Sequence, residues 1–321
     1  MMLVHLFSTV LSVTLLICLF RFSQQCYIEI CENIHLERWM FSIAITLFVT
    51  GWGVRRRSLD WSGAVAAVFV GLILTFSSYC FMVCLLTFFY TSSKATRYCS
   101  EKKKKLEADY KEGGQRNWIQ VICNGGAATE IAMLYLLQGG FGETVIEFDK
   151  DYERSWLAAS VLSSLAGVNG DTWASEIGTV VAKMEPRLIT SLQKVPVGTN
   201  GGFTAAGLFF SALGGSIIGV AYLLALVLCY RNVVLHQVFL LTCMGAFAGL
   251  FGSIIDSVIG ATLQYSGLDM RTGKIVENPA TGVKHISGRP FLNNHSVNMI
   301  MSIINSIVVP TITARLYLFF M

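Results

Sequence analysis

Residues 61–92 form a run of 32 residues without a single charged side chain. One helix of that length would measure about 48 Å at 1.5 Å per residue, well beyond the ~30 Å hydrocarbon core of a bilayer. The run therefore predicts two short membrane helices, 61–76 and 78–92, joined as a hairpin.

The chain contains seven further apolar segments: 3–20, 39–54, 118–138, 155–178, 203–229, 237–260 and 296–320. The first lacks the basic flank and cleavage site of a secretory signal, so we interpret it as an uncleaved helix. Only 14% of the residues are charged, whereas soluble domains carry about a quarter. No long polar linker divides the chain. The sequence predicts one all-α, polytopic integral membrane domain over 1–321, with about nine transmembrane helices, some short or broken.

The distribution of Lys and Arg predicts how this domain is oriented. With Arg55–Arg57 in the cytosol, alternating spans place 18 Lys and Arg in cytosolic loops and five in the opposite loops. The cytosolic loops are then 55–60, 93–117, 179–202 and 261–295. The N-terminus is expected in the cytosol and the C-terminus in the lumen.

Other patterns exclude classes of function. The basic residues follow the loops, and no zinc-finger or RNA-binding motif is present, so no nucleic acid partner is expected. None of the nine cysteines forms a CxxC pair, which argues against zinc. Cys26 and Cys31 share one short loop, where spacing alone favours free thiols over a disulfide. Lys102–Lys105 is interpreted as a charge run that sets orientation and contacts anionic headgroups.

Polar and glycine-rich motifs gather in or beside the predicted cytosolic loops. They are TSSKATRYCSEKKKK (91–105), KEGGQRNWIQ (111–120), GDTWASE (170–176), KVPVGTNGG (194–202), GSIIDSVIGATLQY (252–265) and FLNNHSVN (291–298). Polar residues scattered at random would not all fall at one surface. We therefore expect a functional site there.

Two aspartates lie near the cytosolic ends of the sixth and eighth predicted spans, Asp171 and Asp256. A carboxylate inside a membrane is costly and persists when it pairs or binds a cation. Mg²⁺ takes oxygen ligands, commonly one or two carboxylates plus substrate phosphates. We expect both aspartates to hold Mg²⁺. The alternative is ion pairing with Lys183 or Arg187.

The surroundings of the two aspartates predict packing. In a continuous α-helix Asp171 and Glu176 do not share a face, so they have different partners or the helix breaks at Gly170. Asp256 shares a face with glycines, which predicts close approach of a neighbour. We take that neighbour to be the sixth span, with Asp171 at the same depth. The face consists of Gly245, Gly249, Gly252, Asp256 and Gly260.

Several loops offer phosphate ligands, because glycine turns expose backbone N–H groups and basic side chains neutralise phosphate. No Walker A motif, nucleophile elbow or Ser-His-Asp set is present. The candidate phosphate-binding residues are Lys94, Arg116, Asn117, Lys194, Gly198, Thr199, Asn200, Gly201, Gly202 and Asn294.

These motifs together resemble the core of the transmembrane protein 19 family of animals over nearly the whole chain. The family includes the plant phytyl-phosphate kinase and is distantly similar to dolichol kinase and phytol kinase. Their GDTxAxxxG-like motif matches Gly170, Asp171, Thr172, Ala174 and Gly178. Trp173 and Glu176 depart from the dolichol kinase pattern, which leaves the nucleotide and the acceptor open.

The resemblance implies a CTP-dependent, Mg²⁺-requiring kinase of an isoprenyl monophosphate: phytyl, farnesyl or geranylgeranyl phosphate. It would act at the cytosolic face of the endoplasmic reticulum or another endomembrane. Asp171 would match the acidic motif of the family, and PVGTNGG its glycine-rich phosphate loop. From the residues themselves we further expect Asp171, Asp256 and Glu176 to be catalytic and the acceptor tail to lie between the seventh and eighth spans. Membrane lipid is the expected partner, and the oligomeric state is open.

Two alternatives come from other classes. A membrane transporter or lipid scramblase also uses intramembrane acids and interrupted helices, and the LGGSIIG and LFGSIID segments at 213–219 and 250–256 weakly suggest a repeat. The crowding of polar residues at one surface, not at the midplane, favours the kinase. A non-catalytic scaffold would use the same residues to contact proteins.

Overall fold

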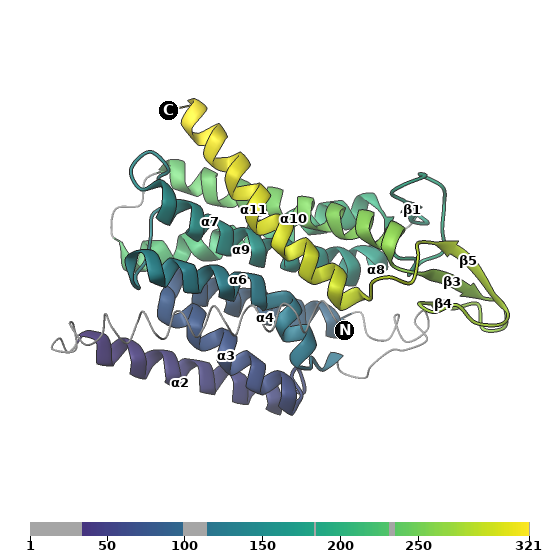
Figure 1. The fold of residues 1–321 in the computed structure, drawn as a ribbon, viewed down its shortest axis with the longest axis horizontal. Coiled ribbons are helices and arrows are strands. Elements are labelled where there is room, and N and C mark those ends of the chain that lie inside the picture. The colour runs from purple at the N-terminus through teal and green to yellow at the C-terminus, as the bar shows by residue number, and fades with distance from the viewer. Residues whose placement is uncertain (1–33, 99–113, 183, 231–234, 321) are drawn as a thin grey trace.

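A computed structural model describes residues 34–98, 114–182, 184–230 and 235–320 (Figure 1). Three expectations fall outside these residues: the first predicted span at 3–20, the Cys26 and Cys31 loop, and the Lys102–Lys105 run.

Long helices dominate the described residues. They are α2 (Ile34–Arg55), α3 (Trp61–Ser77), α4 (Tyr79–Tyr98), α6 (Trp118–Gly139), α7 (Tyr152–Trp173), α9 (Ala205–Cys229), α10 (Leu235–Leu263) and α11 (Asn294–Phe320). Each overlaps a predicted span, so the helical class is confirmed. The count of nine is not confirmed, because the described residues hold these eight. Four of them, α6, α9, α10 and α11, are long and apolar enough to cross a membrane.

The predicted hairpin is present as α3 and α4. Ser78 separates the two helices in an extended conformation, and its N–H donates to the carbonyl of Leu74 (3.1 Å). Because the chain reverses there, two helices of 17 and 20 residues replace one overlong helix.

Capping side chains fix where several helices begin. Four caps each accept a hydrogen bond from the backbone N–H three residues further on, which satisfies a donor that the helix itself leaves open. They are Asp60 for α3, Asn117 for α6, Asp151 for α7 and Thr204 for α9.

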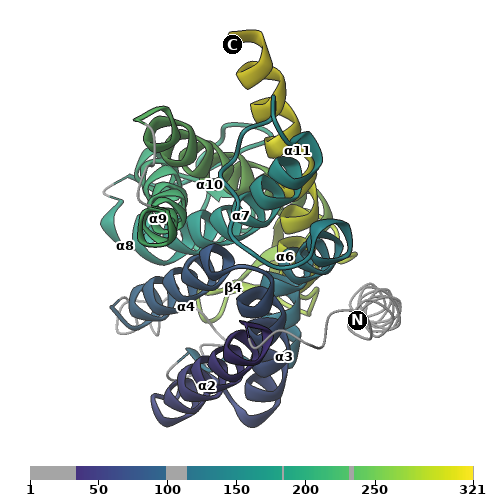
Figure 2. The same cartoon turned by 90° about the vertical axis from the view of Figure 1, so that its left-hand side faces the viewer.

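Helix α7 lies at the centre of the bundle, surrounded by α4, α6, α9, α10 and α11 (Figure 2). Its residues from Leu157 to Gly170 are continuously buried, and many are Ala, Ser or Gly. Small side chains let neighbouring helices approach closely without a water-driven hydrophobic effect. Helices α2 and α3 lie at the side, where α3 packs on α4 and α6.

One end of the bundle carries short strands, and we call it the sheet end (right in Figure 1). Strands β1 (Arg187–Leu188) and β2 (Gly202–Phe203) pair antiparallel. Strands β4 (Ile275–Val276), β3 (Ser266–Asp269) and β5 (Val283–Ser287) form an antiparallel sheet in that order. The described parts of the predicted cytosolic loops all lie at this end. The sequence predicted only a loop at 261–295, and the structure corrects this prediction because the segment contains the three-stranded sheet. Its strands are two to five residues long, which is too short for an alternating sequence pattern to reveal them.

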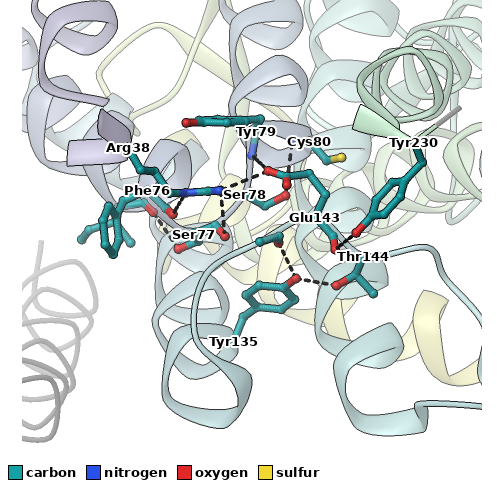
Figure 3. Close-up of polar contacts among 12 residues, drawn as sticks. Arg38, Phe76, Ser77, Ser78, Tyr79, Cys80, Tyr135, Glu143, Thr144 and Tyr230 are labelled. Carbon is teal, nitrogen blue, oxygen red and sulfur yellow. Dashed lines mark hydrogen bonds and ion pairs between the residues drawn. The ribbon is translucent and has the colours of Figure 1, made fainter. Parts of the chain in front are cut away.

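An ion pair fixes the opposite end (Figure 3). Nη2 of Arg38 in α2 lies 3.1 Å from Oε1 of Glu143 in the α6–α7 loop, and the side chains are 10% and 15% exposed. Arg38 Nε also donates to the carbonyl of Phe76 (2.8 Å), while the N–H of Tyr79 donates to the same Glu143 oxygen (3.1 Å). The start of α2 is therefore tied to the α3–α4 turn and to the core.

Candidate functional site

The GDTWASE motif continues α7 without a break at Gly170. The helix widens instead into a π segment, Ala174–Gly178, followed by the short α8 (Thr179–Val181). The N–H of Ala174 donates to the carbonyls of both Gly170 and Asp171. Each residue of a π turn rotates by a smaller angle about the helix axis than a residue of an α turn. Glu176 is therefore turned closer to the side of Asp171 than it would be in a continuous α-helix. Of the two alternatives that the sequence left open, the break at Gly170 is therefore wrong, and the distortion in this motif is a π segment instead.

Gly170 is required by packing. A Cβ at this position would lie 2.5 Å from Cα of Gly249 in α10 and 2.6 Å from the carbonyl oxygen of Ser211 in α9. Real Cβ atoms do not approach backbone so closely, so only glycine allows α7, α9 and α10 to meet here.

A second glycine contact joins the same two helices. A Cβ at Gly252 in α10 would lie 2.9 Å from Cα of Gly167 in α7. The two helices run in the same direction, because α9 packs antiparallel to both. Asp171 and Asp256 each follow their glycine by four residues, about one turn. Both aspartates therefore lie on the sheet-end side of the place where α7 and α10 cross.

Asp256 belongs to a polar cluster between helices. With its amide oriented to suit its neighbours, Asn298 in α11 donates to Oδ2 of Asp256 (3.1 Å) and to the carbonyl of Asn294 (3.2 Å). The side-chain amides of Asn298 and Asn124 in α6 lie 3.2 Å apart. The sequence reasoning missed Asn298 and Asn124 as site residues. The feature that could have identified them is an amide side chain inside an otherwise apolar predicted span.

Asp171 faces the same helix, α11. Ser164 in α7 and Ser302 in α11 share a hydrogen bond of 2.8 Å, and the two helices are antiparallel, since Trp156 bonds to Thr311 further along. Moving seven residues along α7 from Ser164 reaches Asp171, and the matching move along α11 from Ser302 reaches His295, in the first turn of that helix. The register thus brings Asp171 to the first turn of α11, about one turn from Asn298.

Arg116 is held firmly at the start of α6. Its Nη1 donates to Ser93 Oγ (2.8 Å) and its Nη2 to Ser92 Oγ (3.0 Å), and its guanidinium carbon lies 5.8 Å from the Phe89 ring centre. Burial lowers the pKa of Arg116 to about 10, and the negative charge of Glu176 opposes that shift. Arg116 therefore stays cationic at neutral pH and lies within the field of Glu176.

Asn117, the neighbour of Arg116, has a structural role in this geometry. Its side chain accepts the N–H of Gln120 (3.0 Å), and the Gln120 side chain accepts the N–H of Asn117 (3.2 Å). This reciprocal capping box starts α6 and leaves Arg116 as the phosphate candidate of that motif.

The glycine loop packs onto the end of α10. A Cβ at Gly201 would lie 2.6 Å from the carbonyl oxygen of Ser257, the residue after Asp256. Gly198 and Gly201 take positive φ values of 91° and 78°, which glycine adopts without strain. The loop is thereby anchored beside Asp256.

The sequence predicted that consecutive backbone N–H groups of this loop would be available to bind phosphate, but several of them donate to other atoms of the protein. The N–H of Thr199 donates to Pro196 O (3.2 Å), that of Asn200 to Ser266 Oγ (3.0 Å) and that of Gly202 to Thr199 O (3.0 Å). Three of the predicted donors are therefore used to shape the loop. Thr199 itself is buried, and its hydroxyl also bonds to Pro196 O (2.7 Å).

Three other candidates lie on the outside of the sheet end. Lys94 is exposed, with its ammonium 5.7 Å from the Tyr90 ring centre. Lys194 pairs with Glu185 at 3.2 Å, and both side chains are about two-thirds exposed. Asn294 is exposed at the first residue of α11. The structure does not bring these three into the Asp256 cluster by side-chain contacts.

The donor set suits a small Mg²⁺ site. Within the described ranges, no three His, Cys, Asp or Glu side chains gather as a metal site. Mg²⁺ commonly needs only one or two carboxylates, because waters and substrate phosphates complete its shell. The carboxylates of Asp171 and Asp256, on helices that contact each other, are hard donors of the required kind, as are the amide oxygens of Asn124 and Asn298 beside Asp256.

Comparison with known proteins places the chain among membrane proteins. Residues 44–306 match the family model described as integral membrane protein DUF92. The chain belongs to the DUF92 family. This DUF92 chain is similar to Protein PGR of Arabidopsis thaliana, with 36% identity over 285 residues, 88% of this chain and 98% of the relative. It is also 28% identical over 274 residues to an uncharacterized membrane protein of Methanocaldococcus jannaschii, covering 85% and 93%.

No solved structure matches the chain. The expected resemblance to the transmembrane protein 19 type of integral membrane protein is confirmed, and so is the multi-pass membrane class. The names of these DUF92 relatives specify no reaction and no substrate.

Proposed function

We propose that this chain is a CTP-dependent kinase that phosphorylates an isoprenyl monophosphate at the sheet end of the bundle, on the cytosolic face of an endomembrane. One observation supports the proposal most: Asp171 and Asp256 lie on two helices in close contact, α7 and α10, and both follow the glycine contact toward the sheet end. Two carboxylates inside a membrane domain, with a fixed arginine at the same end, suit the binding of phosphates together with a divalent cation.

This reaction does not require the protein to form a covalent intermediate. An oxygen of the acceptor phosphate bonds to the γ-phosphorus of CTP, the bond to the β–γ bridging oxygen breaks, and CDP leaves. The acceptor is already an anionic nucleophile, so it needs no strong base. Such transfer depends on positioning and on neutralising charge. Mg²⁺ held by Asp171 and Asp256 would supply the charge that draws the phosphate oxygens together.

The remaining residues would position and orient. Ser92 and Ser93 hold the guanidinium of Arg116, which suits a forked contact with phosphate oxygens. Asn298 donates to Asp256 and so fixes the direction of that carboxylate. Glu176 favours the charged form of Arg116.

A transporter remains the second candidate, because the Asn124–Asn298–Asp256 cluster lies between membrane helices, where transported polar groups also bind. A transporter would use these groups without turning over a nucleotide.

The test uses purified full-length protein with γ-labelled CTP or ATP and a panel of phytyl, farnesyl and geranylgeranyl phosphates. The proposal expects label in an isoprenyl diphosphate, with CTP preferred and with loss of transfer in EDTA. Folded protein that labels no acceptor in the panel with either nucleotide would overturn the kinase and favour the transporter.

A further inference from the structure

The contact between α9 and α10 leaves no room for a lipid chain, although the acceptor tail was expected there. A Cβ at Gly215 of α9 would lie 2.8 Å from Cα of Gly249 of α10, so the helices touch backbone to backbone. That expectation is therefore wrong. Another pair of helices, α2 and α4, carries the features of a lipid site on its outer surface.

Helices α2 and α4 present the same order of side chains as each approaches the sheet end. Three residues on each helix are spaced by four, and residues four apart lie on one face of a helix. They are Phe48, Trp52 and Arg56 on α2, and Leu86, Tyr90 and Lys94 on α4. Each face thus passes from apolar to aromatic to cationic, as membrane helices do between the hydrocarbon and the headgroups.

A ring contact holds these two faces at one level. The rings of Trp52 and Tyr90 stack with their centroids 6.4 Å apart. The guanidinium carbon of Arg56 lies 5.9 Å from the centre of the Trp52 ring, and the ammonium of Lys94 lies 5.7 Å from that of Tyr90. The two cations therefore lie one turn beyond a shared aromatic layer.

A further arginine joins the end of α2 to α4. Nη2 of Arg97 donates to the carbonyl of Arg56 (2.6 Å) and to Oγ of Ser58 (2.6 Å), and Ser58 is buried. We call Arg56, Arg57, Lys94 and Arg97 the α2–α4 cations. Among the residues that the structure describes, no Asp or Glu lies within ion-pair distance of these four. The described protein thus supplies them with no counter-charge.

Arg57 adopts a backbone conformation that favours glycine. Its φ is 54°, and the only other described non-glycine residue with a positive φ is Leu192 at 58°. The N–H of Arg57 donates to Val54 O and that of Ser58 to Gly53 O (both 2.9 Å), a pattern that usually ends a helix at glycine. Such strain persists where a residue has another role. Setting the orientation of the protein does not require it, because an arginine at an unstrained position serves equally well.

The chains of a lipid bound here would lie on the surface of the helices. The cavity beneath, between α2, α3, α4 and α6, has a volume of about 80 Å³, smaller than the ~150 Å³ that holds one benzene ring. On the outside of α2, Leu47 is 54% exposed and Phe48 is 71% exposed. This apolar surface lies one turn before the aromatic layer, where acyl chains begin.

We propose that the α2–α4 cations bind the headgroup of an anionic phospholipid in the leaflet at the sheet end, with the phosphate at Arg56 and Lys94 and the acyl chains against the apolar turns before Trp52 and Tyr90. Charge complementarity supports an anionic headgroup over a zwitterionic one, since the ammonium of choline would face four cations. The site is separate from the proposed phosphoryl transfer and does not rest on it.

The experiment measures equilibrium binding of fluorescent phosphatidic acid to purified full-length protein in detergent micelles. Unlabelled phosphatidic acid and phosphatidylserine should displace the label at least tenfold more effectively than phosphatidylcholine. Arg56→Gln and Lys94→Gln should each weaken binding about fivefold, the usual effect of one cation near an anionic surface. Arg271→Gln is the matched control, because Arg271 is an exposed sheet-end cation outside this group.

Arg57 gives a sharper test, because its strain and its charge act in opposite directions. Arg57→Gly should raise the thermal midpoint without lipid and weaken binding of phosphatidic acid, whereas Arg57→Lys should retain binding. Leu192→Gly relieves the same strain without removing a charge, so it should bind like the wild type. Wild-type binding in Arg57→Gly would overturn the role of Arg57.

Soluble competitors identify the source of the phosphate. At equal concentration, inorganic phosphate and CTP should displace far less label than phosphatidic acid, because neither carries acyl chains. Elution as a single species shows that each variant is folded. Equal displacement by phosphatidylcholine or inorganic phosphate, displacement by CTP, or wild-type binding in the Arg56→Gln, Lys94→Gln double variant would overturn the lipid site. No phosphoryl transfer is measured, so failure of the kinase assay leaves this result unchanged.

Discussion

Gly252 of α10 lies against Gly167 of α7, with 2.9 Å between a Cβ placed on the first and Cα of the second. Asp171 and Asp256 each lie about one turn further along these helices, so this contact holds α7 and α10 close together just before the two aspartates. The geometry of the candidate site thus depends on residues that carry no functional group.

Gly252→Ala should lower stability by about 1–3 kcal/mol, because the added methyl group meets backbone and the sulfur of Met301 at 3.1 Å. The thermal unfolding midpoint in detergent measures this loss. Gly51→Ala in α2 is the control: among the described residues, no atom outside the local backbone of α2 lies within 4 Å of the added methyl group. The higher helix propensity of Ala should therefore leave stability equal or higher by up to ~1 kcal/mol. An equal effect of both variants would show that the α7–α10 contact is loose.

Asp171→Asn should reduce nucleotide turnover on the order of 100-fold, as loss of one preorganised charged group does, while the folded protein remains. The amide keeps the shape of the carboxylate and removes the charge that a hard cation needs. Asp151→Asn at the other end of α7 is the control, since Asn also caps helices and should retain the bond to the N–H of Arg154. Degradation of Asp171→Asn alone would instead indicate a structural ion-pair role.

Glu143→Gln should destabilise the protein by about 3–5 kcal/mol, because it leaves the charge of Arg38 nearly buried without its counter-ion. Unfolding in detergent tests this. The exposed Lys150–Glu147 pair offers the comparison: Lys150→Gln should leave the unfolding midpoint nearly unchanged, because solvent screens an exposed ion pair. Little change in Glu143→Gln would show that the ion pair does not hold α2 in place.

The predicted orientation is tested by labelling single cysteines in sealed vesicles of known sidedness. Arg271→Cys at the sheet end should react from the cytosolic side and Lys150→Cys from the other, and both native side chains are well exposed. Thr199 is unsuitable as a labelling position because it is buried. Reaction of Arg271→Cys from the lumen would reverse the topology and separate the site from cytosolic CTP.

Apolar length and loop charge were sufficient to predict most of the helical order. The break at Ser78 followed from the length of an uncharged run, and the packing of α10 on α7 followed from glycines spaced to share a face with Asp256. These features depend on local spacing, which a single sequence contains.

Features that depend on several helices were not predictable. The π segment after Trp173 has no sequence period of its own, so the sequence offered only a break at Gly170 or different partners for Asp171 and Glu176. Asn124 and Asn298 were single amides in apolar runs until packing brought them together. The cavity between α2, α3, α4 and α6 arises from side chains on four helices, and no spacing within one helix indicates it.

The central claim is that Asp171 and Asp256 act through a shared divalent cation. Two carboxylates close together repel each other, and a cation removes that cost while it anchors the nucleotide. Calorimetry of CTP binding, with Mg²⁺ and with EDTA, tests this in the wild type and in Asp256→Asn. The account predicts that wild-type binding requires Mg²⁺ and that Asp256→Asn loses both affinity and metal dependence. Equal CTP affinity in EDTA, or no CTP binding under either condition, would contradict it.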